Sequence, residues 1–280
     1  MKKISRRLLL VWCLVGSVSG LAASPPPLKL GVLPTLSPRT LFGNYQPLRA
    51  YLEQSLKRPV EMSTAVDFKA FHRATMAGDY DVVVTAPHLG RLAQIEAGFR
   101  PVATYAATNR ALLIMAKDKP LHSAAEVRGK SVAVFDPHAL VVLQGLHWLA
   151  ERGLKPNVDF KVLETPSHNS VAHSVQSGES VLGITAPAGV RQWPEEFRER
   201  LAIYAELPEQ QGVTWMAHPR LGAAYAKRVQ AALLAFADSP ASKPFFDATG
   251  YQGLRPVSEK DMRRLDPYAK EIASLLRERP

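Results

Sequence analysis

The chain is poor in cysteine: Cys13 is the single one among 280 residues. It lies in a segment that we expect to be removed, so the mature chain has no disulfide to stabilise it. A chain without disulfides needs a hydrophobic core. The roughly 255 residues that follow the expected leader are enough for one core or two smaller ones.

The chain also lacks the short motifs of common enzymes and cofactor sites. Gly129-Lys130-Ser131 resembles the end of a phosphate-binding loop, but Ala124 stands where that loop needs its first glycine. The zinc-protease, serine-hydrolase and dinucleotide-binding motifs are missing too. We therefore predict no cofactor, no metal and no catalysis. An enzyme with dispersed catalytic residues stays the least favoured hypothesis.

Long apolar runs are missing after the N-terminus, where residues 8–18 form a short one. Lys2, Lys3, Arg6 and Arg7 precede this run, and Gly20-Leu-Ala-Ala23, with the small-residue spacing of a signal-peptidase site, follows it. This order is typical of a secretory signal peptide, and the run is too short to span a bilayer. We predict a signal peptide at 1–23 and a periplasmic mature protein.

The net charge of +10 refers to the full chain, and that of the mature protein is smaller. Four of the positive charges belong to the expected signal peptide, which leaves an excess of about six. The remaining basic residues are scattered and are not interleaved with aromatic ones. We therefore predict a solvated basic surface and no nucleic-acid partner.

One stretch organises the rest of the chain. After Gly78, we predict a strand over residues 81–85, which contains the β-branched run Val82-Val83-Val84 and stops at Ala86-Pro87. The runs 132–135 and 181–184 likewise end in short loops that contain proline. Such runs are typical of strands buried on both faces. Ligands of open α/β sheets bind at the carboxyl ends of strands, so these three ends predict a cleft.

Strands alternate with helical patterns twice, over 28–105 and over 131–205. This predicts an α/β protein of two lobes, each a mostly parallel sheet flanked by helices. Segments 106–116 and about 206–217 would cross between the lobes as a hinge, and the C-terminal helices would return to the first lobe. Lobe 1 would comprise 24–108 and 213–280, and lobe 2 would comprise 109–212.

Several stretches together resemble a known family: residues 30–35, 78–87, 113–118, 127–136, 159–160 and 167–168. The chain resembles periplasmic solute-binding proteins of the phosphonate, phosphite and phosphate type, which serve ATP-driven (ABC) importers. The resemblance covers nearly all of the mature chain. It implies a type II periplasmic binding fold of two lobes, a ligand in the cleft, no catalysis and a membrane permease as partner.

The sequence departs from that family where the anion would bind. The resemblance implies a Ser-Thr-Ser-Gly-like run after Asp136, but His138-Ala139-Leu140-Val141 stands there without hydroxyls. Val181 stands about where the family often has an acidic residue, whereas His168 matches a histidine that contacts the ligand. Either the ligand differs, or helix amides and His138 replace the lost hydroxyls.

Eight residues are the candidates for ligand contact. Some lie at the ends of strands that we expect to face the cleft. Others follow those strand ends in loops or at helix starts, and one lies near a crossing segment. Their alternative roles are packing and helix capping. The candidates are Thr35, Ser37, Thr85, His88, Tyr105, His138, Ala139 and His168.

Two functions remain open. The first is an exported protein that captures a small, anionic solute, with a phosphorus oxyanion as one candidate, for an ABC importer. The second is a sensor or interaction module of the same fold that regulates a membrane histidine kinase or complex. Its ligand site would be changed or degenerate.

Overall fold

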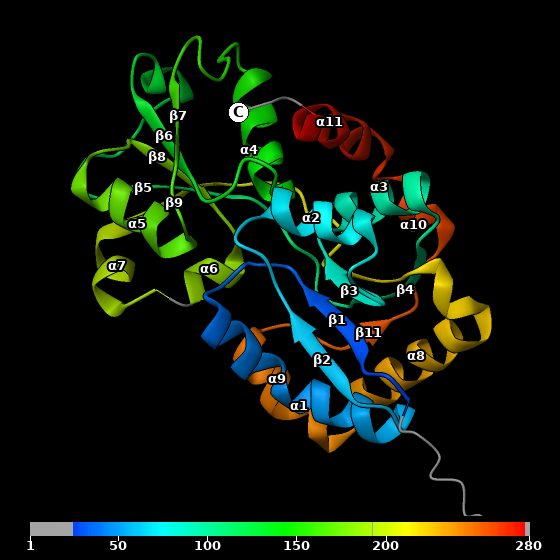
Figure 1. Cartoon of the computed structure of the whole chain (residues 1–280). Helices are drawn as coiled ribbons and strands as arrows, with labels where there is room; N and C mark the ends of the chain where they lie inside the picture. The colour runs from blue at the N-terminus through cyan, green and yellow to red at the C-terminus, as the bar shows by residue number, and fades with distance from the viewer. Residues whose placement is uncertain (1–24, 192, 278–280) are drawn as a thin grey trace, which may run out of the picture.

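The computed structural model describes residues 25–191 and 193–277. The expected signal peptide, 1–23, lies outside the described residues. Within them the strands form a six-stranded and a five-stranded sheet, each flanked by helices (Figure 1). We call the first sheet with its helices lobe 1, and the second, largely green in Figure 1, lobe 2.

The sheet of lobe 1 has the strand order β11-β4-β10-β3-β1-β2. Strand β1 pairs in parallel with β2 and β3. Strand β10 runs antiparallel to both β3 and β4, and β11 runs antiparallel to β4. The strands are β1 (Leu28–Val32), β2 (Val60–Ser63), β3 (Val82–Thr85), β4 (Arg100–Tyr105), β10 (Thr214–Ala217) and β11 (Leu254–Arg255).

The sheet of lobe 2 has the strand order β7-β6-β8-β5-β9. Strand β6 pairs in parallel with β7 and β8, and β5 runs antiparallel to β8 and β9. The strands are β5 (Leu112–Ala116), β6 (Ser131–Val134), β7 (Lys161–Glu164), β8 (Leu182–Thr185) and β9 (Leu201–Glu206).

Both sheets are therefore mixed, but most strands of each run in one direction, as expected: β1, β2, β3 and β4 in the first sheet and β6, β7, β8 and β9 in the second. The register gives the reason for β10 and β5, which run the other way. Thr214, which opens β10, lies opposite Thr85 at the end of β3, and Leu112, which opens β5, lies opposite Thr185 at the end of β8. Each of these strands enters its sheet from the hinge, at the edge where the parallel strands finish. It must then run against them.

Helices cover both lobes, and the C-terminal ones pack on lobe 1, where α8 and α9 contact α1, and α10 and α11 contact α3. In lobe 1 they are α1 (Pro38–Leu56), α2 (Phe68–Ala77), α3 (Pro87–Ala97), α8 (Gly222–Ala237), α9 (Lys243–Thr249), α10 (Glu259–Arg263) and α11 (Asp266–Arg277). In lobe 2 they are α4 (Leu140–Ala150), α5 (His168–Ser177), α6 (Pro187–Arg191) and α7 (Glu195–Arg200). Among the described residues no helix is both long and apolar enough to cross a membrane.

Local signals set the helix ends close to the cleft. Asp67 caps α2 by accepting a hydrogen bond from the Ala70 amide, and Ser37 caps α1 through the Thr40 amide. Side-chain oxygens at this position satisfy amides that the first helical turn leaves free. Pro38 follows Ser37 as the first residue of α1, a position that suits proline, and Pro47 lies inside the same helix.

The two crossing segments pair with each other. They are shorter than expected, 106–111 and 207–213, because β5 and β10 take up the rest. The Asn109 amide donates to the Gln210 carbonyl over 2.9 Å, and the Gln210 amide donates back over 2.6 Å. A Cβ on Gly212 would lie 2.5 Å from the Ala107 carbonyl oxygen, so this approach requires glycine. The exact lobe bounds given above stay a prediction.

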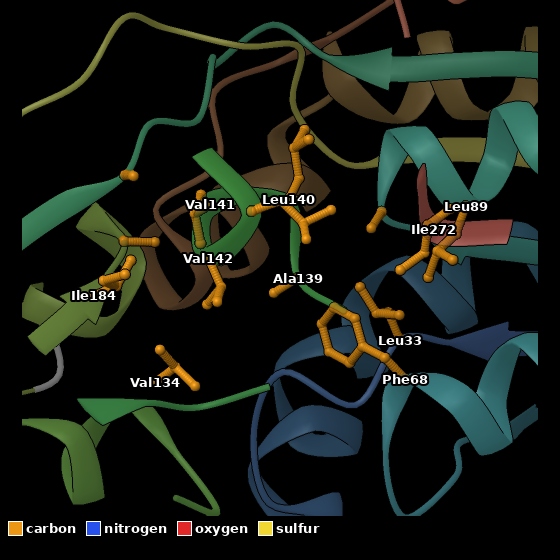
Figure 2. Packing of buried hydrophobic residues seen from close by; sticks show 14 of the residues in the cluster. Leu33, Phe68, Leu89, Val134, Ala139, Leu140, Val141, Val142, Ile184 and Ile272 are labelled. Atoms are coloured by element: carbon orange, nitrogen blue, oxygen red, sulfur yellow. The ribbon is translucent and has the colours of Figure 1, made fainter. Parts of the chain in front are cut away.

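One hydrophobic cluster continues from lobe 1 into lobe 2. We call the part of it that joins the lobes the interlobe seam. Figure 2 shows the start of α4, Ala139 and Leu140, lying between side chains of the two lobes. On the lobe 1 side are Leu33, Phe68, Leu89 and Ile272, and on the lobe 2 side are Val134, Val142 and Ile184. The segment that replaces the family's hydroxyl-rich loop in this chain therefore packs as part of the core.

Candidate ligand cleft

A cavity of about 500 Å³ lies between the lobes at the ends of the strands. Its lobe 1 wall comes from α1, the loop after β1 and the loop after α9. Its lobe 2 wall comes from the starts of α4, α5 and α6, and both crossing segments close one side. The strand ends beside it are those of β1, β3, β6 and β8, as the sequence pattern predicts.

Three of the eight candidate residues line this cavity: Thr35, Ala139 and His168. His168 is the first residue of α5, and its Nδ1 is hydrogen bonded to the Thr185 hydroxyl over 2.8 Å. Its ring lies 4.0 Å from that of Phe135, centroid to centroid. Burial lowers the pKa of His168 to about 4, so at neutral pH it offers a neutral imidazole and no charge.

The other five candidates do not line the cavity. The Ser37 hydroxyl caps α1, and Thr85 is buried opposite Thr214 within the sheet. Tyr105 is buried behind the lobe 1 wall, where its ring stacks on that of Tyr251 at 4.0 Å.

His88 and His138 lie together in the interlobe seam. The His88 Nε2 donates to the His138 carbonyl over 2.9 Å, and the His138 Nδ1 lies 2.9 Å from the Asp136 carboxylate. Both side chains are therefore committed to contacts within the protein. Helix amides and His138 were the two candidates to replace the lost hydroxyls. In the structure the start of α4, with its amides, lies beside the cavity, whereas His138 does not line it.

Sequence reasoning missed Arg191, the last residue of α6, which lines the cavity. Its guanidinium crosses to lobe 1, packs on Gly250 and donates to the Thr249 carbonyl over 3.3 Å. No carboxylate among the described residues pairs with it. The available signal was its place just after Thr185-Ala186-Pro187, the end of the third buried strand.

The other charges of the cavity wall cancel. Arg110 in the first crossing pairs with Glu209 over 3.0 Å and with Glu206 over 3.1 Å. Arg110 and Glu209 line the cavity together. No charged side chain of this wall compensates the positive charge of Arg191. This charge therefore favours an anionic ligand.

Tyrosine hydroxyls add neutral donors on the lobe 1 side. Tyr45 and Tyr251 line the cavity, and the Tyr45 hydroxyl is hydrogen bonded to that of Tyr105 over 3.4 Å. Burial raises the pKa of Tyr45 and Tyr105 well above the usual value, and that of Tyr251 to about 12. All three hydroxyls therefore stay protonated at neutral pH, and those of Tyr45 and Tyr251, which line the cavity, can donate to an anion.

Two helix starts at the cavity have no side-chain cap. Ala86 precedes α3 and Ala139 precedes α4, and neither side chain accepts a hydrogen bond from the first turn. Both alanines line the cavity. Free first-turn amides carry partial positive charge, which complements an anion.

A family model with the description "ABC transporter, phosphonate, periplasmic substrate-binding protein" matches residues 30–262. The chain belongs to this family. The resemblance inferred from the short stretches is confirmed, and the protein is a member of a family of periplasmic solute-binding proteins.

Solved structures show the same fold. A binding-protein component of an ABC phosphonate transporter from Pseudomonas aeruginosa is 16% identical and has a TM-score of 0.77, over 90% of this chain and 89% of that one. PhnD1 from Prochlorococcus marinus, in complex with methylphosphonate, is 15% identical with a TM-score of 0.78, over 89% and 99%. The predicted two-lobed periplasmic binding fold is confirmed.

A third structure belongs to a different functional class. It is a histidine kinase sensor domain with similarity to periplasmic binding proteins, 16% identical with a TM-score of 0.57, over 81% of this chain and 97% of that one. The fold alone therefore suits both an importer subunit and a sensor.

Proposed function

We propose that this protein is an exported, non-catalytic binding protein that captures a small anionic solute in the interlobe cavity for an ABC importer. The observation that carries the proposal is Arg191. It reaches from lobe 2 to the lobe 1 wall of the cavity, and no carboxylate of the described residues neutralises it.

Capture depends on donors from both lobes. Lobe 1 contributes the hydroxyls of Tyr45 and Tyr251, and lobe 2 contributes Arg191 and the uncapped start of α4. An anion held by both sets binds the closed form more tightly than the open form, so it shifts the population toward closure. The paired crossing segments supply the hinge, and the closed form is what a membrane permease would recognise.

A phosphorus oxyanion is the first ligand to test. The family description names phosphonate, and PhnD1 is a complex with methylphosphonate. In this chain the guanidinium of Arg191 would take the place of the expected hydroxyls, since arginine binds tetrahedral oxyanions through two parallel donors.

The cavity chemistry favours binding without turnover. His168, which lines it, is a weak base because burial lowers its pKa to about 4, and its Nδ1 is engaged by Thr185. A general base works best with a pKa close to the working pH. We therefore assign His168 to ligand contact.

The test is calorimetric titration of the mature protein with phosphate, phosphite, methylphosphonate and sulfate. We expect at least one anion to bind and to raise thermal stability. A hundredfold excess over Kd stabilises the folded state by about 2.7 kcal/mol. Arg191→Gln should weaken that binding at least tenfold. Lys161→Gln removes one charge from an exposed edge position of lobe 2 and should change nothing. If Arg191→Gln bound the anion as tightly as Lys161→Gln, Arg191 would have no role in binding.

The sensor function stays a second candidate because the fold also occurs in a histidine kinase sensor domain and because the lobes share an apolar seam. Such a seam can hold the lobes together without a ligand. Small-angle scattering distinguishes the two candidates. An importer subunit should become more compact when methylphosphonate or another bound anion is added, whereas unchanged compactness with a bound anion favours the sensor.

A further inference from the structure

We propose that the interlobe seam is a pH-dependent latch: it holds the lobes together while His88 is neutral and releases them when His88 takes up a proton. The closed form is the arrangement of this structure, in which the seam is formed. The inference goes beyond the proposed function, because it concerns how the lobes are held without a ligand and does not depend on which anion is captured.

His88 lies in the seam where a hydrogen bond joins the two lobes. It is the second residue of α3 in lobe 1, its side chain is fully buried, and its Nε2 donates to the His138 carbonyl of lobe 2 over 2.9 Å. Figure 2 shows apolar side chains beside this bond, Leu89 next to His88 and Ala139 next to His138. Because lobe 2 covers the bond, separation of the lobes would expose the His88 ring to water.

The closed form does not accommodate a second proton on His88. Nε2 already donates its proton to a carbonyl, and Nδ1 is buried without a hydrogen-bond partner. A protonated ring would carry a buried charge and one unsatisfied donor, and both cost free energy. Burial accordingly lowers the pKa of His88 to about 4.

The titratable groups that face His88 come from three segments. His72 of α2 and His138 of the loop before α4 oppose a charge on His88, whereas Glu271 of α11 favours one. Glu271 is paired elsewhere, with a histidine of α4. The Asp136 carboxylate is likewise engaged, since it accepts from the His138 amide over 2.8 Å and lies 2.9 Å from the Nδ1 of that residue. Among the described residues none of these carboxylates pairs with His88.

A second histidine between the lobes has the opposite pH response. His147 of α4 is hydrogen bonded to Glu271 of α11 over 2.9 Å, and this bond raises the pKa of His147. Protonation therefore strengthens that contact, whereas it breaks the one at His88. The side chains of His147 and Glu271 are 47% and 33% exposed, so water screens the pair and its contribution is small. The buried His88 therefore sets the direction, and acid opens the lobes.

The expected size follows from the pKa of His88 in the two forms. The closed form has the lowered value of about 4, and an exposed ring in the open form has about 6.5. Above pH 6.5 His88 is neutral in both forms, so the closed form keeps its full stabilisation. As the pH falls toward 4 the open form binds the proton first. Between pH 7.5 and pH 5 the closed-to-open ratio should fall by up to about 30-fold.

Two spin labels measure this ratio. The mature chain has no cysteine, because Cys13 lies in the expected signal peptide. Val66→Cys in lobe 1 and Val158→Cys in lobe 2 replace residues that are 90% and 80% exposed. Labels at both positions should report the closed and open forms as two distances in the protein without ligand. We expect the closed distance to dominate at pH 7.5 and the open one to gain at pH 5, with circular dichroism to confirm that the protein stays folded.

His88→Gln isolates the effect of the proton. Its amide can still donate to the His138 carbonyl but does not titrate, so the closed-to-open ratio should be the same at both pH values. His147→Gln removes the opposing contact and should open in acid at least as much as wild type. His122→Gln, at an exposed position, is the matched control and should behave as wild type.

A wild-type ratio that changes by less than about threefold between the two pH values would overturn the latch. An equal fall in His88→Gln would overturn it too. The wild-type measurement decides even if a variant fails to fold. Because no ligand is added, the result does not depend on anion capture: failure of the latch leaves the proposed function intact, and absence of anion binding leaves the latch intact.

Discussion

His88 of lobe 1 donates its Nε2 proton to the carbonyl oxygen of His138 in lobe 2 over 2.9 Å. Because a carbonyl only accepts, His88 is held as the tautomer with its proton on Nε2. Its Nδ1 is buried without a partner. Beside it, the amide of Phe68 in lobe 1 donates to the Asp136 carboxylate of lobe 2 over 3.2 Å. The seam is thus joined by directional bonds as well as by apolar contact.

Removal of the His88 hydrogen bond should shift the lobes toward the open form. His88→Phe keeps a flat ring but leaves the His138 carbonyl without its donor. That carbonyl can reach water only when the lobes open. A loss of about 1 kcal/mol is expected for such a bond, which corresponds to a roughly fivefold change in the closed-to-open ratio. Scattering without ligand should give a larger radius of gyration than for wild type. An unchanged radius would mean that apolar contacts alone hold the seam.

Stability should fall in mild acid. Burial lowers the pKa of His72, His88 and His168 to about 4 in the folded protein, against about 6.5 when unfolded. A depressed histidine pKa means that the unfolded state binds protons first. The stabilisation is complete above pH 6.5 and is lost as the pH falls toward 4.

Urea unfolding at pH 7 and pH 5 measures this loss. For the fully buried His88 we expect roughly 2 kcal/mol between these pH values, at 1.36 kcal/mol per pKa unit. His88→Phe should remove that share of the pH dependence. His122→Gln, at an exposed position, should keep it. Equal unfolding free energies at the two pH values would contradict the assignment.

Two glycines in helices should respond to alanine in opposite directions. A Cβ on Gly145 of α4 would lie 2.7 Å from the Ile184 side chain, so Gly145→Ala overfills the core and should cost about 1–3 kcal/mol. A Cβ on Gly43 of α1 meets nothing within 4 Å. Gly43→Ala should stabilise by about 0.5–1 kcal/mol through helix propensity. Denaturant titration checks both, and destabilisation by Gly43→Ala would show that α1 is packed differently.

The position of His168 depends on Gly189. A Cβ there would lie 2.5 Å from the His168 ring, which has the Thr185 hydroxyl as its hydrogen-bond partner. Gly189→Ala should therefore displace the ring in the cavity and weaken methylphosphonate binding about tenfold, a change of about 1.4 kcal/mol. Calorimetry measures this, with Gly43→Ala as the control that leaves the cavity untouched. Wild-type affinity in a folded Gly189→Ala protein would exclude His168 from ligand contact.

Asp81, at the start of β3, should be structural. It accepts from Arg220 Nε over 2.8 Å and from the Lys29 amide over 2.9 Å. Asp81→Asn keeps the shape but leaves Arg220 without its counter-charge. The half-exposed arginine limits the expected cost to about 1–2 kcal/mol. Asp79→Asn, two residues earlier and exposed, should lie within about 0.5 kcal/mol of wild type in the same urea titration. Equal stability of the two variants would contradict this role.

Local patterns in the sequence were enough for the family, the two lobes and the strand ends at the cleft. Buried β-branched runs, helix caps such as Asp67 and stop glycines such as Gly78 act within a few residues, so they can be recognised without the fold. The same reasoning placed Thr35, Ala139 and His168 at ends that do face the cavity.

Only the tertiary structure decided which side chains belong to the site. Whether His88 and His138 face the cavity or the seam depends on how the lobes meet, and no local pattern encodes that. The sequence around Arg110 and Arg191 does not show which of them is paired. In the structure β9 and the second crossing bring Glu206 and Glu209 to Arg110, while Arg191 meets a backbone carbonyl. Charge pairing over such separations is set by packing. The sequence by itself therefore determined the scaffold and the edge where a ligand binds, and the packing of the two lobes determined the chemistry offered there.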